Sequence, residues 1–248
     1  MKNTMKTTCF LLALALLTGV ETRAQLSPDL IMETYNSNIS AITNGAINKS
    51  VLESTMERDN AADRSAGRGT AASRRLMSTA YTPTPALRQQ TVQAYANRLR
   101  TNNPAGGQAI TATFGLGKYD YNQTYRQILD GTGLRENDAA DALAWYMLMG
   151  WAVVHNVQDE KAITIPMAQE VRAQLAPLLA GSARVRTRSA QMGEELKLQT
   201  VVVQGGWQAA IKEGKLAAYQ QGIGNLFKTQ YGMDMTEFKL TSQGFAKK

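Results

Sequence analysis

An uninterrupted apolar stretch near the middle of the chain constrains the fold more than any other feature. From Ala142 to Val154, every residue is apolar, aromatic or glycine. A helix built from this stretch is apolar on all of its faces, so other elements must cover it on every side. The sequence therefore predicts an all-α domain that packs around a buried central helix.

The same stretch is too short to cross a membrane. A transmembrane helix needs about 20 consecutive apolar residues, whereas Asp141 directly precedes this stretch and His155 directly follows it. Asn137 is a good N-cap, and Asp138 and Asp141 fall in the first turn, where carboxylates stabilise the helix dipole. His155 suits the C-terminal end. We therefore predict a core helix and no transmembrane segment in the mature chain.

The first 24 residues have the three parts of a secretory signal peptide. Two lysines provide positive charge, residues 9–20 form the apolar core, and Ala24 supplies the small residue before a cleavage site. We therefore expect residues 1–24 to be removed and the mature chain to begin at Gln25. This predicts an exported protein, either periplasmic or secreted from a bacterium.

Cysteine content and charge narrow the class of protein further. The only cysteine, Cys9, lies inside the expected signal peptide, so the mature chain has no disulfides and depends on an ordinary apolar core. The formal charge is +7, and removal of residues 1–24, which carry a net +2, leaves about +5. A basic surface attracts anionic envelope components, although it also simply keeps a protein soluble. No recognisable nucleic-acid-binding motif accompanies it, so we predict no nucleic-acid partner.

Outside the central helix, the chain divides into a polar N-terminal region, a helical domain and a tail. Residues 25–75 are predicted to be a flexible segment and linker, because residues 57–73 have almost no large apolar side chains to offset the entropy of ordering. Residues 76–231 are predicted to form one bundle-like domain of about six helices. Within it, residues 104–114 favour a short helix but also alternate like a strand. Residues 232–248 are predicted to be a loosely ordered tail.

Two carboxylates at the start of the central helix form the candidate polar site. Asp138 and Asp141 are three residues apart and therefore share one face of a helix, where they could hold a cation or act as acid and base. The alternative, which we favour, is that they cap the helix and stabilise its dipole. Asp141 adjoins the apolar stretch, so we expect it to be partly buried and paired with an arginine such as Arg98 or Arg126.

Aromatic residues of the central helix are the second candidate set. Trp145, Tyr146 and Trp151 could line a ligand pocket, together with Tyr121 and Tyr125. Aromatic side chains at helical spacing are more often part of a core, and we favour that interpretation.

No other pattern specifies a reaction, a metal or a cofactor. His155 is the only histidine, so a serine–histidine–aspartate triad would have to use it, and no GxSxG motif accompanies it. The chain has neither an HExxH motif nor a cysteine cluster for zinc, and residues 115–118 lack the spacing of a phosphate-binding loop. We therefore predict no catalytic residue, no metal site and no cofactor.

Part of the central region resembles a bacterial family of secreted helical proteins that is known only as a domain of unknown function. The resemblance is carried by Gly133-Leu134, the block NDAADALAWY at residues 137–146, and Trp151, with a similar TPTPALR lead-in at residues 82–88. It implies an exported, all-helical domain. It implies no activity, because the family has no established catalytic residues.

Two functions are consistent with these features. The first, which we favour, is a non-catalytic exported protein that binds an unknown protein or another component of the bacterial envelope. The alternative is a hydrolase that uses Asp138 and Asp141 on a cell-wall or glycan substrate. A cleft holding two carboxylates about 5–10 Å apart, at least one with a raised pKa, would favour the hydrolase. Aspartates engaged as caps would favour the binding protein.

Overall fold

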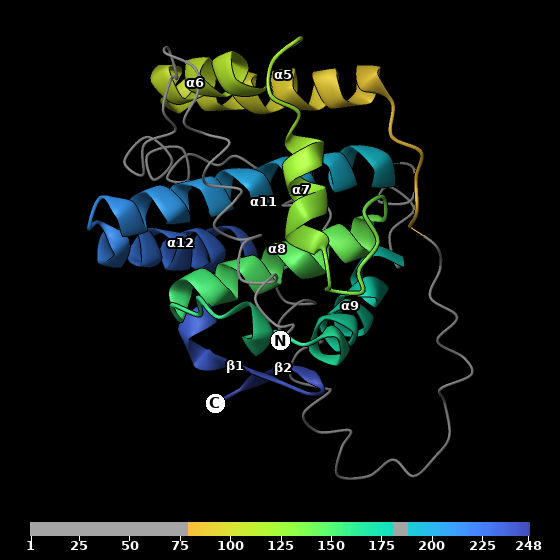
Figure 1. Cartoon of the computed structure of the whole chain (residues 1–248), viewed down its shortest axis with the longest axis vertical. Coiled ribbons are helices and arrows are strands. Elements are labelled where there is room, and N and C mark those ends of the chain that lie inside the picture. The colour runs from red at the N-terminus through yellow and green to blue at the C-terminus, as the bar shows by residue number, and fades with distance from the viewer. Residues whose placement is uncertain (1–78, 181–187) are drawn as a thin grey trace, which may run out of the picture.

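The computed structural model describes residues 79–180 and 188–248, and in these ranges seven α-helices pack together with one β-hairpin (Figure 1). The all-α prediction is confirmed for this part of the chain. The expected signal peptide and the segment 25–75 lie outside the described residues. The elements are α5 (Pro85–Asn102), α6 (Pro104–Phe114), α7 (Tyr121–Leu129), α8 (Ala139–Val154), η1 (Glu160–Ala162), α9 (Ile165–Ala180), α11 (Ser189–Lys212), α12 (Leu216–Tyr231), η2 (Met235–Glu237), β1 (Phe238–Thr241) and β2 (Gly244–Lys247).

The central helix α8 has the surroundings that its sequence requires. All of its residues are buried except Trp151 and Val154, which are only partly covered. α11 and α12 lie on one side of it, and α9 and the hairpin lie on the other (Figure 1). The prediction of a buried central helix is therefore confirmed. Among the described residues, no helix combines the length and the apolar character needed to cross a membrane.

Local sequence signals define the starts of the first two helices. The Thr84 side chain accepts a hydrogen bond from the Leu87 amide at 3.1 Å, and Pro85 occupies the first turn of α5. Asn103 does the same for α6, accepting from the Gly106 amide at 2.7 Å. Residues 104–114 are therefore helical, because a side-chain cap followed by proline favours a helix start.

Gly150 allows α12 to approach α8 closely. A Cβ atom at this position would lie 2.2 Å from two carbons of the Phe227 ring. That ring lies 5.2 Å from the Tyr146 ring and 5.5 Å from the Tyr231 ring, measured between centroids. Tyr146 therefore belongs to an aromatic core between α8 and α12.

Gly150→Ala is expected to lower the free energy of unfolding by about 1–3 kcal/mol, because the added methyl group overlaps the Phe227 ring. Urea denaturation measures the change. Gly205→Ala is the matched control, because Gly205 is also inside a helix but has no atom within 4 Å of the added methyl group. The control should gain about 0.5–1 kcal/mol from helix propensity alone. Equal gains at both positions would show that α8 and α12 are not in tight contact at Gly150.

α11 is buried on more faces than its sequence indicates. Its apolar side chains predict a single buried stripe, yet Glu194, Glu195 and Lys197 are each no more than 2% exposed. The reason is that α5, α7, α8 and α12 all contact α11 (Figure 1). The Gly205-Gly206 pair does not break the helix.

The C-terminal residues are not the loosely ordered tail that the sequence predicts. β1 and β2 pair in antiparallel fashion, and Phe238 and Phe245 are 2% and 1% exposed. The edges of this hairpin are held by side chains from the helices. Trp151 Nε1 donates to the Phe238 carbonyl at 3.1 Å, and the Gln174 amide both donates to the Phe245 carbonyl and accepts from its N–H, each at 3.0 Å. The hairpin is therefore part of the domain core.

Gln174→Ala is expected to lower the free energy of unfolding by about 1–3 kcal/mol, because it leaves the buried N–H and carbonyl of Phe245 without partners. Hydrogen exchange should also accelerate at the Phe245 amide. Gln169→Ala, an exposed glutamine on the same helix, is the control and should change neither measurement. Unchanged exchange at Phe245 in the Gln174 variant would contradict this role for the side chain.

Candidate functional site

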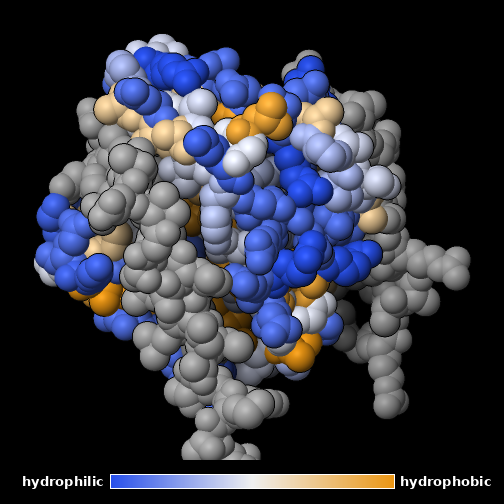
Figure 2. Space-filling model, turned by 45° about the horizontal axis from the view of Figure 1, so that its top comes forward, coloured by the Kyte–Doolittle hydropathy of each residue, from blue (hydrophilic) through white to orange (hydrophobic). Residues whose placement is uncertain are grey.

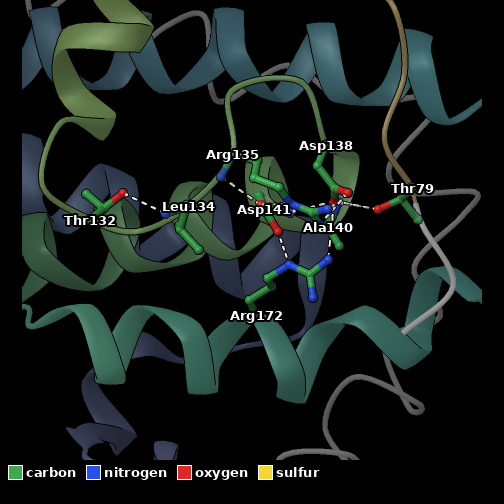
Figure 3. Close-up of polar contacts among 8 residues, drawn as sticks. All are labelled: Thr79, Thr132, Leu134, Arg135, Asp138, Ala140, Asp141 and Arg172. Atoms are coloured by element: carbon green, nitrogen blue, oxygen red, sulfur yellow. Dashed lines mark hydrogen bonds and ion pairs between the residues drawn. The ribbon is translucent and has the colours of Figure 1, made fainter. Parts of the chain in front are cut away.

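The start of α8 is capped by Asp138, one residue later than the sequence predicts. Asp138 Oδ1 accepts from the amides of Ala140 at 3.0 Å and Asp141 at 3.2 Å, and from the Thr79 hydroxyl at 2.6 Å (Figure 3). Asn137, the predicted cap, instead accepts at its carbonyl from the Tyr81 amide at 3.0 Å. The segment 79–81 is therefore fastened along the start of α8.

Asp138 and Asp141 form a cluster with two arginines, which we call the aspartate–arginine cluster. Arg135 extends from the loop before α8, and Arg172 extends from α9 (Figure 3). Arg135 lies 2.6 Å from Asp138 Oδ2 and 2.9 Å from Asp141 Oδ2, while Arg172 Nε donates to Asp141 Oδ1. The two aspartates are 0% and 1% exposed. Burial lowers the pKa of Arg172, and Asp138 opposes this change.

The arginine partners differ from those expected for Asp141. Arg98 Nη2 pairs with Glu195 at 2.5 Å, and Arg126 Nε pairs with Glu136 at 3.1 Å. The partners of Asp141 come from the preceding loop and from α9, and the packing of α9 on α8 cannot be read from helical periodicity. The expectation that Asp141 would be buried and paired with arginine is met, but with different arginines.

The aspartate–arginine cluster is internally balanced. Two carboxylates face two guanidinium groups, and the carboxylates also accept hydrogen bonds from backbone amides. Removing one partner from such a buried ion pair destabilises the fold, because the remaining charge is left buried without compensation. No group of three or more metal-binding side chains occurs among the described residues. The arrangement ties α8 to α9 and to the segment 79–81.

A second buried cluster, which no sequence pattern predicted, lies where α11 faces α7. We call it the glutamate–lysine cluster. Glu194 accepts hydrogen bonds from Lys197 Nζ at 2.6 Å, from Tyr81 at 2.9 Å and from Tyr121 at 2.5 Å. Lys197 also donates to Asn137 Oδ1 at 3.1 Å. Glu194 and Lys197 are both 0% exposed.

The protonation states in the glutamate–lysine cluster follow from burial. Burial and the nearby Glu194 carboxylate raise the pKa values of Tyr81 and Tyr121, so both phenols remain hydrogen-bond donors. Burial lowers the pKa of Lys197, and Glu194 opposes that shift. The Lys197 ammonium lies 5.7 Å from the Tyr125 ring centroid, within cation–π range. The cluster therefore contains one ion pair supported by neutral donors and aromatic rings.

The candidate aromatic residues of α8 have different neighbours, and each is largely covered. Trp145 is 9% exposed, and Tyr146 belongs to the α8–α12 core. Trp151 lies 6.5 Å from Phe245 between ring centroids, under the hairpin. His155 caps the end of α8, as predicted, and its Nε2 lies 2.9 Å from a carbonyl in η2.

A shallow surface groove lies between α5 and the loop 115–120 that joins α6 to α7. Its volume is about 200 Å³. Two of the three exposed large apolar side chains among the described residues belong to this loop, Leu116 at 79% and Tyr119 at 43%. Where it is coloured, the face viewed in Figure 2 is mostly hydrophilic, with small and separate apolar patches. The groove is lined by Pro85, Arg88, Gln89, Val92, Phe114, Gly115, Leu116, Gly117, Lys118, Tyr119, Asp120 and Tyr121.

The groove carries incompletely used positive groups. Arg88 Nη1 lies 3.3 Å from Asp120 Oδ2, while Arg88 Nε is buried and makes no hydrogen bond within the described residues. Lys118 is exposed, and no carboxylate among the described residues forms an ion pair with it. Tyr121 lines the groove and also donates a hydrogen bond to Glu194. The groove is therefore in contact with the glutamate–lysine cluster through this side chain.

In the described residues, the fold and these sites define a predominantly helical domain with two buried polar clusters and a small amphiphilic surface groove. The chain belongs to a family of unknown function, DUF6683, whose family model matches residues 3–246. The expected membership of a family of unknown function is thereby confirmed, and the family description assigns no activity. No curated protein and no solved structure matches the chain.

Proposed function

We propose that this protein is an exported, non-catalytic binding protein of the bacterial envelope, and that the groove is its recognition site. One observation carries the non-catalytic part of the proposal. Both aspartates that could act as acid and base are buried, and arginines and backbone amides already engage them. Engaged aspartates of this kind favour helix capping over catalysis.

The same geometry argues against the glycan hydrolase. Such an enzyme needs two carboxylates that reach the substrate, one of them protonated at working pH. Here the groove contains Asp120, which is paired with Arg88 and accepts from the Asn122 amide at 3.0 Å as the cap of α7. The buried aspartates lie outside its lining. The lining of the groove therefore holds one carboxylate and not the pair that such an enzyme needs.

The groove supports the binding part of the proposal. Leu116 exposes most of its surface on a loop, where an apolar side chain gains nothing from the domain core. An exposed apolar side chain beside the exposed Lys118 ammonium is a combination that a ligand can satisfy.

Site-specific photo-crosslinking tests the recognition site. A photoreactive amino acid is placed at position 116 of the full chain in a bacterium that encodes it. Position 165 serves as the control, because Ile165 is also an exposed apolar residue at 46% but lies outside the groove. We expect discrete adducts from position 116 and none of the same mass from position 165. Identical adducts from both positions, or none from position 116, would overturn the proposal.

The export part of the proposal rests on residues 1–24 and has its own test. The full chain is expressed in a bacterium, and the protein from the periplasm or the medium is sequenced from its N-terminus. We expect Gln25 to be the first residue. Recovery of an uncut chain from the cytoplasm alone would contradict export.

A further inference from the structure

We propose that the side chains of Lys197 and Asn137 join in a covalent isopeptide bond, which the glutamate–lysine cluster forms by itself. The two residues lie 60 positions apart in the sequence. Asn137 is in the loop before α8, and Lys197 is on α11, which contacts α8 (Figure 1). Glu194, one turn before Lys197, transfers the protons. This proposal goes beyond recognition at the groove and does not depend on it.

The three groups that the reaction needs lie next to one another. Lys197 Nζ lies 3.1 Å from Asn137 Oδ1, and this oxygen is bonded to the carbon that the amine attacks. The same Nζ lies 2.6 Å from Glu194 Oε1. The amine therefore has only a short distance to move before it reaches the carbon. Groups held this close react much faster than free ones, because little entropy remains to be lost.

Neighbouring residues hold both sides of the reaction in place. The backbone carbonyl of Asn137 accepts a hydrogen bond from the Tyr81 amide at 3.0 Å. The Tyr81 and Tyr121 hydroxyls donate to Glu194 at 2.9 and 2.5 Å. These contacts fix the backbone that carries the carboxamide and the orientation of the carboxylate. The amine therefore meets the carboxamide in a defined geometry.

Burial favours the form of the lysine that reacts. Lys197 is the only lysine among the buried residues of the described ranges, and Glu194 beside it is also 0% exposed. Burial lowers the pKa of Lys197, because the charged ammonium loses its hydration. The neutral amine is the nucleophilic form of a lysine. One proton transfer across the 2.6 Å hydrogen bond to Glu194 produces it.

The reaction balances without any further reagent. One proton passes from the Lys197 ammonium to the Glu194 carboxylate, and the resulting amine attacks Cγ of Asn137. The bond between Cγ and the Asn137 amide nitrogen then breaks. That nitrogen takes the proton that the attacking amine loses, and it leaves as ammonia. The products are a secondary amide, ammonia and a protonated Glu194, which donates to the new amide oxygen.

The bond ties together two elements that the chain places far apart. It closes a loop from residue 137 to residue 197 and links the start of α8 to α11. A covalent link across a segment of this length constrains the unfolded chain, as a disulfide does. The chain has one cysteine, Cys9, so a disulfide within the chain cannot supply such a link.

Mass spectrometry of the purified full chain, digested with trypsin under denaturing conditions, tests the proposal. The bond blocks cleavage after Lys197, so residues 136–161 and 189–212 should be recovered as one linked species. Its mass should lie about 17 Da below the sum of the two peptides, because one ammonia is lost. Finding both peptides in one species excludes a loss of ammonia at an N-terminal glutamine. Recovery of residues 136–161 and 189–197 only as separate peptides would overturn the proposal.

Two variants and a control assign the roles. Asn137→Ala removes the carboxamide at a partly exposed position and should yield no linked species. Glu194→Gln keeps both reacting groups but removes the proton acceptor, so the linked fraction of the folded protein should fall at least about tenfold. Lys239→Gln, which changes an exposed lysine on β1, should match the wild type. An undiminished linked fraction in Glu194→Gln would overturn the role of Glu194, and a linked species in Asn137→Ala would overturn the bond.

Discussion

Asp141→Ala is expected to lower the free energy of unfolding by about 3–5 kcal/mol. The variant leaves the Arg172 guanidinium, whose side chain is only 12% exposed, without the carboxylate that its Nε–H contacts. It also removes the acceptor for the backbone N–H of Arg135. Because both groups sit against the start of α8, the loss should appear as a lower urea midpoint of the whole domain.

Glu213→Ala is the control for the Asp141 variant. It removes a carboxylate from a pair with Lys215, in which the side chains are 39% and 42% exposed, so it should have little effect. A wild-type urea midpoint for Asp141→Ala would contradict the structural role of the aspartate–arginine cluster.

Lys197→Met is expected to lower the free energy of unfolding by a similar amount, about 3–5 kcal/mol, because it leaves the Glu194 carboxylate buried without its cation. The hydroxyls of Tyr81 and Tyr121 would still donate to that carboxylate, but neutral donors do not balance its charge. Thermal and urea unfolding of the purified full chain measure the effect.

The double variant Glu194→Gln with Lys197→Met separates charge from packing. Neutralising both members removes the unpaired charge, so the double variant should be more stable than Lys197→Met alone. The double variant should also lose less stability than the sum of the losses in the two single variants. The difference should be well above the roughly 0.5 kcal/mol within which independent sites are additive. Additive effects would show that Glu194 and Lys197 do not form the buried pair described above.

The parts of the fold that depend on residues close together in the sequence were predictable. The continuous apolar run identified α8 as a buried helix, because a helix that is apolar on all faces must be covered on every side. The cap-and-proline pairs at Thr84-Pro85 and Asn103-Pro104 encode two helix starts locally, because capping acts within a few residues. The N-cap of α8 was misplaced by one residue, since Asn137 and Asp138 are both good caps and the choice depends on Thr79, far away in sequence.

The polar interior was not predictable in the same way. The spacing of apolar residues in α11 predicts one buried stripe, and Glu194 and Lys197 look like an ordinary exposed pair three residues apart. They are buried because α7 packs across α11 (Figure 1), and no local pattern encodes that contact. The one available signal was their position on either side of Leu196, an apolar residue that is itself 0% exposed.

The hairpin was missed for a related reason. Its strands are only four residues long, so an alternating pattern has too few positions to be distinctive. Backbone groups of both strands are hydrogen-bonded by Trp151 and Gln174, which lie on helices far earlier in the chain. A short terminal segment can therefore be well ordered when side chains from the core satisfy its edges.

The central claim is that Asp138 and Asp141 are structural residues and that recognition occurs elsewhere. The most direct test is to compare the melting temperatures of the wild type and of Asp141→Asn. Each protein is melted alone and with divalent cations, cell-wall fragments and acidic glycans. We predict that the variant melts at a lower temperature by the same amount with and without every ligand. A ligand-dependent rise in melting temperature in the wild type that vanishes in the variant would contradict the claim and make Asp141 part of a binding site.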